Sequence, residues 1–588
     1  MKRFFAALIM LLWANPLAES GPESATEDGK LNTFFKKYLD EEFRRRPLEA
    51  TRLGDHRFDH LLDDVSAKAR SGWKERTAKT LVDLPKEISK KKLSRSGQID
   101  FEILQHHLTR ELWLAENTNP FETDPRIYND YITESVYLLL TQSTLPKLDN
   151  IKNCRSRMVQ VPRVVEAARA NLKNPPKVFV ETAIRQNRGA IAFYEQGVFE
   201  LAGETPQLSI FRDEAKKIVA VLKEYQKFLE EDLLPRAKGE WRLGKEKFVR
   251  KLELELDAGI SAQEVLREAE AEMDRVEAEM YVIARQLWSE LFPKKALPVD
   301  DTEGKRHTIR QVLDVVSKEH GKPADLVKDA TAAANRIKDF IKTHDILRLP
   351  EPDRCRIIEM PEFQRGNTIA FLNPAPPLDV RASSYYAISP PPHDWDKNRV
   401  ASYMQEYNRH MLHLLTIHEA YPGHYVQLEY SNRHPSLIRK VLYSGVFAEG
   451  WAVYTEQMML DQGYGKGDLK LRLNQLKWYL RAVANAILDF KMHCTGMTDE
   501  EALQFLVMRA YQSEGEAILK IIRAKQSSCQ LSTYFVGRMA FVRLRRRFQT
   551  EMGENFDLGR FHEAALAHAT LPVKYLPELV RERLARPR

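Results

Sequence analysis

The segment from Ser261 to Leu291 restricts the possible folds most strongly, because its apolar residues recur every three or four positions. That spacing places them along one side of an α-helix. Ser261 and Glu264 have the spacing of a capping box, in which each side chain binds the backbone amide of the other residue. We therefore predict a helix of about 30 residues whose apolar stripe packs into a core rather than binding a cofactor. The stripe consists of Val265, Ala269, Met273, Val276, Met280, Ala284, Leu287 and Leu291.

Helical patterns of the same kind occupy most of the chain. They are clear at residues 155–172, 211–233 and 324–343, and the segment from Thr308 to Gln311 repeats the capping signal. From Asn398 onward the pattern is helical to the C-terminus. The predicted fold is therefore predominantly all-α, with two helical lobes.

The sequence changes in character between Pro350 and Trp395, where short β-branched and aromatic runs are separated by prolines. Because proline cannot donate to a strand ladder, we expect a small β ribbon with open edges. The three runs are residues 356–360, 368–372 and 384–388. The predicted division of the chain is a signal peptide (1–20), a linker (21–30), an N-terminal lobe (31–350), a ribbon with its Pro-rich connection (351–395) and a C-terminal lobe (396–588).

The N-terminal residues have the pattern of a secretory signal. Lys2 and Arg3 precede an uncharged run from Phe4 to Trp13. That run is too short to span a bilayer, and no later segment reaches the roughly 18 apolar residues of a spanning helix. We expect an exported protein, periplasmic or secreted, without stable membrane insertion. An N-terminal helix of a cytosolic protein is the alternative reading.

Charge and cysteine content exclude several classes of protein. The 588 residues include 90 Lys and Arg against 83 Asp and Glu, and a net charge of +7 is too weak to indicate a nucleic-acid partner. The most basic run, residues 543–547, is typical of a solvated helix face. The four cysteines form no C-x-x-C pair, which excludes a zinc-thiolate site and a thioredoxin motif. One disulfide is compatible with an oxidising compartment, but the sequence does not pair the cysteines.

The residues most typical of catalysis lie in His418-Glu419-Ala-Tyr-Pro-Gly-His424. Zinc peptidases use two helical histidines as ligands and a glutamate beside the metal-bound water, usually as H-E-x-x-H. Here the two histidines are six residues apart, which puts them on different faces of a regular helix. Pro422 clashes with the carbonyl of His418, so the helix must bend or end here. We predict that this break brings His424 beside His418 to bind one zinc ion.

A third ligand is expected from another helix. Glu449 and Glu456 are seven residues apart in an apolar helical segment, so the two carboxylates share one stripe. We assign Glu449 as the ligand and Glu456 as the residue that orients an imidazole. His413 and His410, about one and two turns before His418, are alternative ligands, although local packing roles are favoured for them. The alternative without a metal site is that His418 and His424 are core histidines with local hydrogen-bond partners and that the glutamates are surface charges of their helices.

Further polar residues have predicted roles in catalysis or substrate binding. Asp489 and His493 are four residues apart on one helix, so the carboxylate is expected to fix the tautomer of the imidazole. Tyr534 and His493 are the candidate donors to the oxyanion of peptide hydrolysis. Arg481 and Arg523 are the candidate partners of a substrate carboxylate. For these two arginines, and for Tyr534 and His493, a purely structural hydrogen bond is at least an equal alternative.

The segments at 418–424 and 449–456 together resemble the domain of unknown function 885 family of bacterial, often exported or lipoprotein-type, proteins. Residues 47–59 resemble its opening motif, and Arg481, Asp489, His493 and residues 532–537 resemble its C-terminal motifs. The resemblance implies a helical zinc metalloprotein similar to the gluzincin peptidases, which include helical carboxypeptidases and dipeptidases with deep channels. The family shares the six-residue histidine spacing. Many members have a further histidine where this chain has Tyr425.

We therefore predict an exported zinc metallopeptidase with a peptide substrate. Zinc held by His418, His424 and Glu449 lowers the pKa of a water, while Glu419 takes its proton and passes it to the leaving amine. Residues 368–388 would offer a strand edge to the peptide. A non-catalytic peptide-binding or structural protein that retains the fold is one alternative, but it would not need Glu419 as a base. A zinc hydrolase of non-peptide amides is another, which the sequence does not distinguish.

Overall fold

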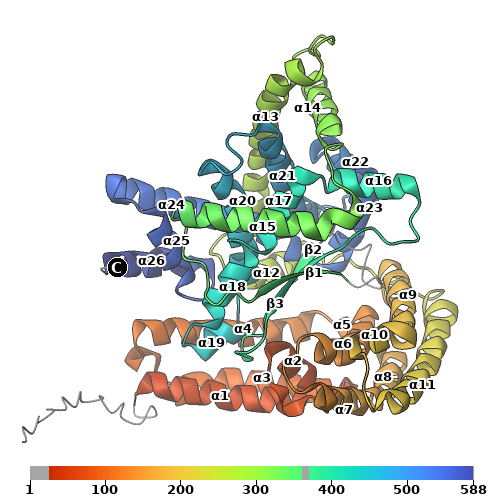
Figure 1. The fold of residues 1–588 in the computed structure, drawn as a ribbon. Coiled ribbons are helices and arrows are strands. Elements are labelled where there is room, and N and C mark those ends of the chain that lie inside the picture. Colours follow the sequence, from red (N-terminus) through yellow and green to blue (C-terminus); the bar gives the residue numbers. More distant parts are fainter. Residues whose placement is uncertain (1–25, 361–369, 587–588) are drawn as a thin grey trace, which may run out of the picture.

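The structure, a computed structural model, describes residues 26–360 and 370–586 and is predominantly helical with one small sheet (Figure 1). The predicted fold class is confirmed. The predicted signal peptide at residues 1–20 lies outside the described residues. Within the described ranges, every helix is too short or too polar to cross a bilayer.

The first eleven helices form a layer along the bottom of Figure 1. The first helix begins at Glu27, inside the predicted linker, because the Thr26 hydroxyl accepts the Gly29 amide and caps it. The pattern at residues 155–172 is two helices rather than one, since Pro162 starts a second helix. The helices are α1 (Glu27–Arg45), α2 (Pro47–Leu53), α3 (Ala67–Glu87), α4 (Arg95–Asn117), α5 (Pro120–Thr123), α6 (Arg126–Thr141), α7 (Lys147–Met158), α8 (Val161–Asn171), α9 (Lys177–Ala192), α10 (Val198–Ala202) and α11 (Leu208–Lys227).

Most of the remaining helices pack above this layer in Figure 1, whereas the short helix α19 (Leu437–Val441) lies against α1 and α4. The capping box at Ser261 is confirmed, and the helix that it begins runs to Leu291. The capping signal predicted at Thr308 is wrong, because the helix begins at Thr302 and the Thr308 hydroxyl donates to the Gly304 carbonyl at 2.8 Å. These helices are α12 (Lys245–Leu256), α13 (Ala262–Leu291), α14 (Thr302–Val316), α15 (Leu326–Thr343), α16 (Lys397–Glu406), α17 (Arg409–Glu419), α18 (His424–Asn432), α19 (Leu437–Val441), α20 (Gly445–Asp461), α21 (Leu469–Cys494), α22 (Asp499–Arg509), α23 (Glu514–Gln526), α24 (Thr533–Met552), α25 (Leu558–Leu566) and α26 (Leu576–Ala585).

The sheet contains β1 (Cys355–Glu359), β2 (Ala370–Asn373) and β3 (Ser384–Ile388) in the order β1-β3-β2. Strand β3 is parallel to β1 and antiparallel to β2, with Leu372 opposite Tyr386. The strands lie at or within a few residues of the predicted runs. Strand β2 is therefore at an edge of the sheet, and that edge faces the site described below.

Two hydrophobic cores stabilise the molecule. Among the described residues, the smaller core lies mainly among α6 to α11 and includes Leu48 of α2, and the larger one joins α1 and α4 to the sheet and the C-terminal helices. The boundary predicted near residue 350 does not separate them, because the larger core contains residues from both sides of it. All four cysteines are free, so no disulfide joins the layers.

Candidate metal centre

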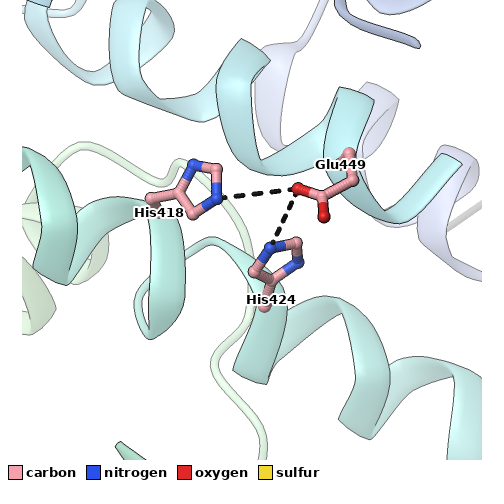
Figure 2. A group of neighbouring side chains, drawn as sticks. All are labelled: His418, His424 and Glu449. Carbon is pink, nitrogen blue, oxygen red and sulfur yellow. Dashed lines mark ion pairs between the residues drawn. The ribbon is translucent and has the colours of Figure 1, made fainter. Parts of the chain in front are cut away.

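The predicted helix break lies between the two histidines of the motif (Figure 2). Helix α17 ends at Glu419 and α18 begins at His424. A side chain at Gly423 would lie 1.9 Å from the His418 carbonyl oxygen, so only glycine fits at this turn. The Trp451 indole donates to the Pro422 carbonyl at 2.8 Å and anchors the turn to α20. The break brings the two imidazole centroids to 4.8 Å from each other.

Glu449 of α20 completes a group of three potential metal ligands. Its Oε2 lies 3.8 Å from His418 Nε2 and 3.5 Å from His424 Nε2, and Figure 2 shows both rings directed at the carboxylate. Ligand atoms about 2 Å from one tetrahedral zinc are about 3.3 Å apart, so this arrangement fits a single ion. Glu449 Oε2 is buried and has no hydrogen-bond partner. Burial opposes ionisation, but His424 and His418 hold the pKa of Glu449 below its ordinary value.

Glu456 lies behind His418, as predicted for a residue that orients an imidazole. Its Oε1 accepts from His418 Nδ1 at 2.7 Å and from the Trp478 indole at 3.1 Å. This hydrogen bond directs His418 Nε2 toward Glu449. Burial disfavours the imidazolium, yet the bond to Glu456 and the charges of Glu456, Glu419 and Glu449 raise the pKa of His418 to about 9. Burial raises the pKa of Glu456.

Glu419, the last residue of α17, connects the centre to the sheet. Its Oε2 accepts the backbone amide of Leu372 at 3.0 Å. That amide belongs to the edge strand β2 and is not used in the ladder to β3. The candidate base therefore contacts the strand edge that was predicted to receive a peptide.

Tyr534 of α24 lines the same cavity as Glu449. Helices α20 and α24 cross at two glycines: a side chain at Gly450 would lie 2.3 Å from the Gly537 backbone. This close approach carries Tyr534, one turn before Gly537, toward Glu449. The Tyr534 hydroxyl accepts hydrogen bonds from Arg523 Nη2 at 3.1 Å and Gln530 Nε2 at 3.3 Å. Burial and the charge of Glu449 raise the pKa of Tyr534, which keeps the phenol protonated.

The predicted pairing of Asp489 with His493 is wrong. Asp489 instead accepts the Cys529 amide at 3.0 Å and the Ser532 hydroxyl at 2.9 Å, because the turn before α24 presents closer donors. His493 Nε2 donates to the Ala524 carbonyl at 3.0 Å and Nδ1 accepts from the Leu243 amide at 3.5 Å. With both ring nitrogens bound to backbone, His493 has no proton to offer an oxyanion. Burial lowers its pKa to about 4.

The two arginines predicted to bind a substrate carboxylate have different surroundings. Arg481 Nη1 lies 2.9 Å from Glu516 Oε1, and its guanidinium stacks 4.5 Å from the Trp478 ring centroid. It therefore supports Trp478, the tryptophan that donates to Glu456. Arg523 is exposed and lies near enough to lower the pKa of Glu449, although burial and the two histidines act more strongly there.

The other residues that the sequence left open have local partners. His410 Nε2 lies 3.4 Å from Glu319 Oε2, and His413 Nδ1 donates to the Tyr464 hydroxyl at 2.6 Å. The packing roles favoured for both are therefore confirmed. The Tyr425 hydroxyl accepts the Arg354 amide at 2.7 Å, which ties α18 to the segment before β1.

A cavity of about 2160 Å³ opens over this centre. Its walls come from the N-terminal layer as well as from the sheet and the C-terminal helices, so the site lies between parts of the chain far apart in sequence. Sequence reasoning missed Gln530, whose only signal is its position four residues before Tyr534. Residues around the cavity include Arg110, Trp241, Leu372, Glu419, Glu449, Gln530 and Tyr534.

Comparison with known proteins gives a family and two similar structures. The sequence model of a family described as bacterial protein of unknown function, DUF885, matches residues 47–580. A candidate lipoprotein of unknown function from Shewanella oneidensis has a TM-score of 0.79 and 29% identity, covering 94% of this chain and 99% of its own. A candidate lipoprotein from Colwellia psychrerythraea, at 17% identity, shares the fold with a TM-score of 0.76 over 95% of this chain and 99% of its own. No curated protein matches the sequence.

Proposed function

The chain belongs to the DUF885 family of bacterial proteins of unknown function, and from this premise we propose that it is a zinc-dependent peptidase with a site similar to that of the gluzincins. The observation that carries the proposal is the group His418, His424 and Glu449, whose ligand atoms all lie within 4.8 Å of one another. Glu449 Oε2 is buried, makes no hydrogen bond and faces the Nε2 atoms of both imidazoles, and a cation bound between these three atoms would stabilise that arrangement. Glu419 stands beside this group.

Three protein ligands would leave one coordination position open, as in catalytic zinc sites. When bound, zinc would lower the pKa of a coordinated water toward neutrality and polarise a carbonyl oxygen. An imidazole ligand must be neutral, so His418 would lose the proton that Glu456 and its neighbours favour. Metal affinity would therefore rise with pH.

Glu419 would accept a proton from the attacking water and then pass it to the leaving amine. Before substrate binds, its Oε2 is held by the Leu372 amide. A peptide that added to the edge of β2 would compete for the same amide with its own carbonyl. Substrate binding would thus release the carboxylate beside the scissile bond, and Tyr534 would donate to the charge that develops on the carbonyl oxygen.

The size of the cavity favours a peptide over a small amide. Pockets for small molecules have volumes of about 300 to 1,000 Å³, whereas this cavity is about 2160 Å³. It therefore accommodates an extended chain of several residues. We further propose that the protein is exported, because residues 1–20 have the pattern of a signal peptide and both structural neighbours are described as candidate lipoproteins.

Metal analysis followed by digestion of a mixed peptide library tests the proposal. Purified protein should hold one zinc ion, and Glu419→Gln should keep that zinc while peptide cleavage falls by about 10² to 10⁴. Glu224→Gln, a change at an exposed glutamate distant in sequence from the site, is the matched control and should cleave at the parent rate. Equal cleavage by Glu419→Gln and the parent would refute the role of the base. Peptide binding without cleavage by any variant would favour a non-catalytic binding protein.

A further inference from the structure

We propose that Gln530 is a positioning residue that fixes the direction of the Tyr534 hydroxyl proton, so that this proton points into the cavity above the metal centre. The catalytic role of Gln530 rests on the proposed function. The direction of the proton rests only on the geometry of Arg523, Gln530 and Tyr534.

The orientation of the Gln530 amide follows from its neighbour. Gln530 Oε1 lies 2.8 Å from Arg523 Nη2. A guanidinium can only donate hydrogen bonds, so the amide oxygen must face Arg523. The amide nitrogen then faces the Tyr534 hydroxyl, at 3.3 Å, and must act as a donor.

The Tyr534 oxygen therefore receives two hydrogen bonds from groups that cannot accept its proton. Arg523 Nη2 donates at 3.1 Å and Gln530 Nε2 at 3.3 Å. A phenol oxygen that accepts from both cannot direct its own O–H at either donor, because two protons would meet. The hydroxyl must donate elsewhere. Tyr534 and Glu449 line the same cavity, so the remaining direction leads toward the position of a substrate carbonyl.

The backbone holds this arrangement in place. Asp489 accepts the Cys529 amide and the Ser532 hydroxyl, which fixes the turn that carries Gln530. The Thr533 hydroxyl donates to the Gln530 carbonyl at 2.7 Å. Donors fixed before the reaction are more effective than donors that must reorient. Asp489 therefore supports the Gln530 turn, a role that differs from the one predicted for it.

Gln530→Glu tests the inference with almost no change in shape. The new carboxylate would still accept from Arg523, but it would also accept the Tyr534 hydroxyl proton and turn it away from the cavity. We expect kcat to fall by about 10² to 10³, as for loss of one oxyanion donor, with KM changed less than about threefold. Tyr534→Phe should lose a similar amount. The double variant should be no slower than Tyr534→Phe alone, because both changes remove the same donor.

Gln530→Met separates this role from a merely structural one. Methionine keeps neither hydrogen bond, so a structural role predicts that it is more harmful than glutamate. Our inference predicts the reverse order, since methionine does not compete for the Tyr534 proton. Zinc content should be unchanged in both variants. Greater loss of kcat in Gln530→Met than in Gln530→Glu would overturn the inference.

Neutron diffraction from deuterated crystals shows the direction of the Tyr534 O–D bond, and this measurement does not depend on catalytic activity. The Tyr534 deuteron should point into the cavity in the parent and toward the carboxylate in Gln530→Glu. A deuteron that points at Arg523 or Gln530 in the parent would overturn the inference. If the parent cleaved no peptide while its deuteron pointed into the cavity, the geometric inference would stand and the peptidase proposal would fail.

Discussion

Replacing Gly423 by alanine should force open the turn that holds the predicted zinc ligand His424. An added Cβ would lie 1.9 Å from the His418 carbonyl oxygen and 2.3 Å from that of Ile417, whereas real contacts of this kind are essentially never shorter than 3.0 Å. Both obstacles are backbone atoms and cannot rotate away. The turn must therefore open by about 1 Å. Metal sites tolerate deviations of only about 0.2 Å in ligand distances.

His424 follows Gly423 directly, so the opening moves its imidazole away from Glu449, which now lies 3.5 Å from it. We expect zinc affinity to fall at least about 100-fold, the upper limit for loss of a residue that only orients a ligand. Competition with a chromophoric chelator measures the affinity, and circular dichroism checks that the variant remains folded. Gly445→Ala is the matched control, because nothing lies within 4 Å of a Cβ added there. Zinc affinity of folded Gly423→Ala within threefold of the control value would refute the reasoning that the turn places His424 on the metal.

Two further predictions concern the carboxylates around the centre. Glu449→Ala should abolish zinc binding, whereas Glu456→Ala should weaken it about 10 to 100-fold, and the reverse order in metal titrations would contradict the ligand assignment. Asp489 is buried, and burial raises its pKa from 3.8 to about 7 despite the hydrogen bonds from Cys529 and Ser532. A raised pKa favours the neutral carboxyl in the folded state, so its contribution to stability is present below about pH 4 and is lost as pH rises toward about 7. Asp489→Asn stays neutral, keeps an oxygen that can accept the Cys529 amide, and can donate from its amide nitrogen to the Ser532 hydroxyl oxygen. It should flatten the pH dependence of thermal unfolding in that window, and parallel curves for variant and parent would contradict this.

Local sequence patterns predicted the helices because those patterns act within a few residues. The capping box at Ser261 satisfies amides of its own first turn, and the apolar stripe behind it fits any core. The break at Pro422 was predictable for the same reason, since the clash with His418 lies within one helical turn. The single helix expected at residues 155–172 failed because Pro162 starts a second helix, a signal that the apolar period concealed.

Partners from distant parts of the chain decided the rest of the candidate site. Asp489 and His493 have an ideal helical spacing, yet Asp489 binds the turn at Cys529, forty residues later. No spacing rule identifies a donor at that separation.

The sequence by itself therefore determined the helical class, the small ribbon, the helix break and the candidate ligands His418, His424 and Glu449, because residue type and short-range sterics suffice for these. Only the tertiary structure decided which polar groups meet. The crossing of α20 and α24 at Gly450 and Gly537 sets Tyr534 beside Glu449. Two polar groups form a hydrogen bond only when packing brings them close together. Because the core is packed densely, their distance depends on all of its helices and strands together.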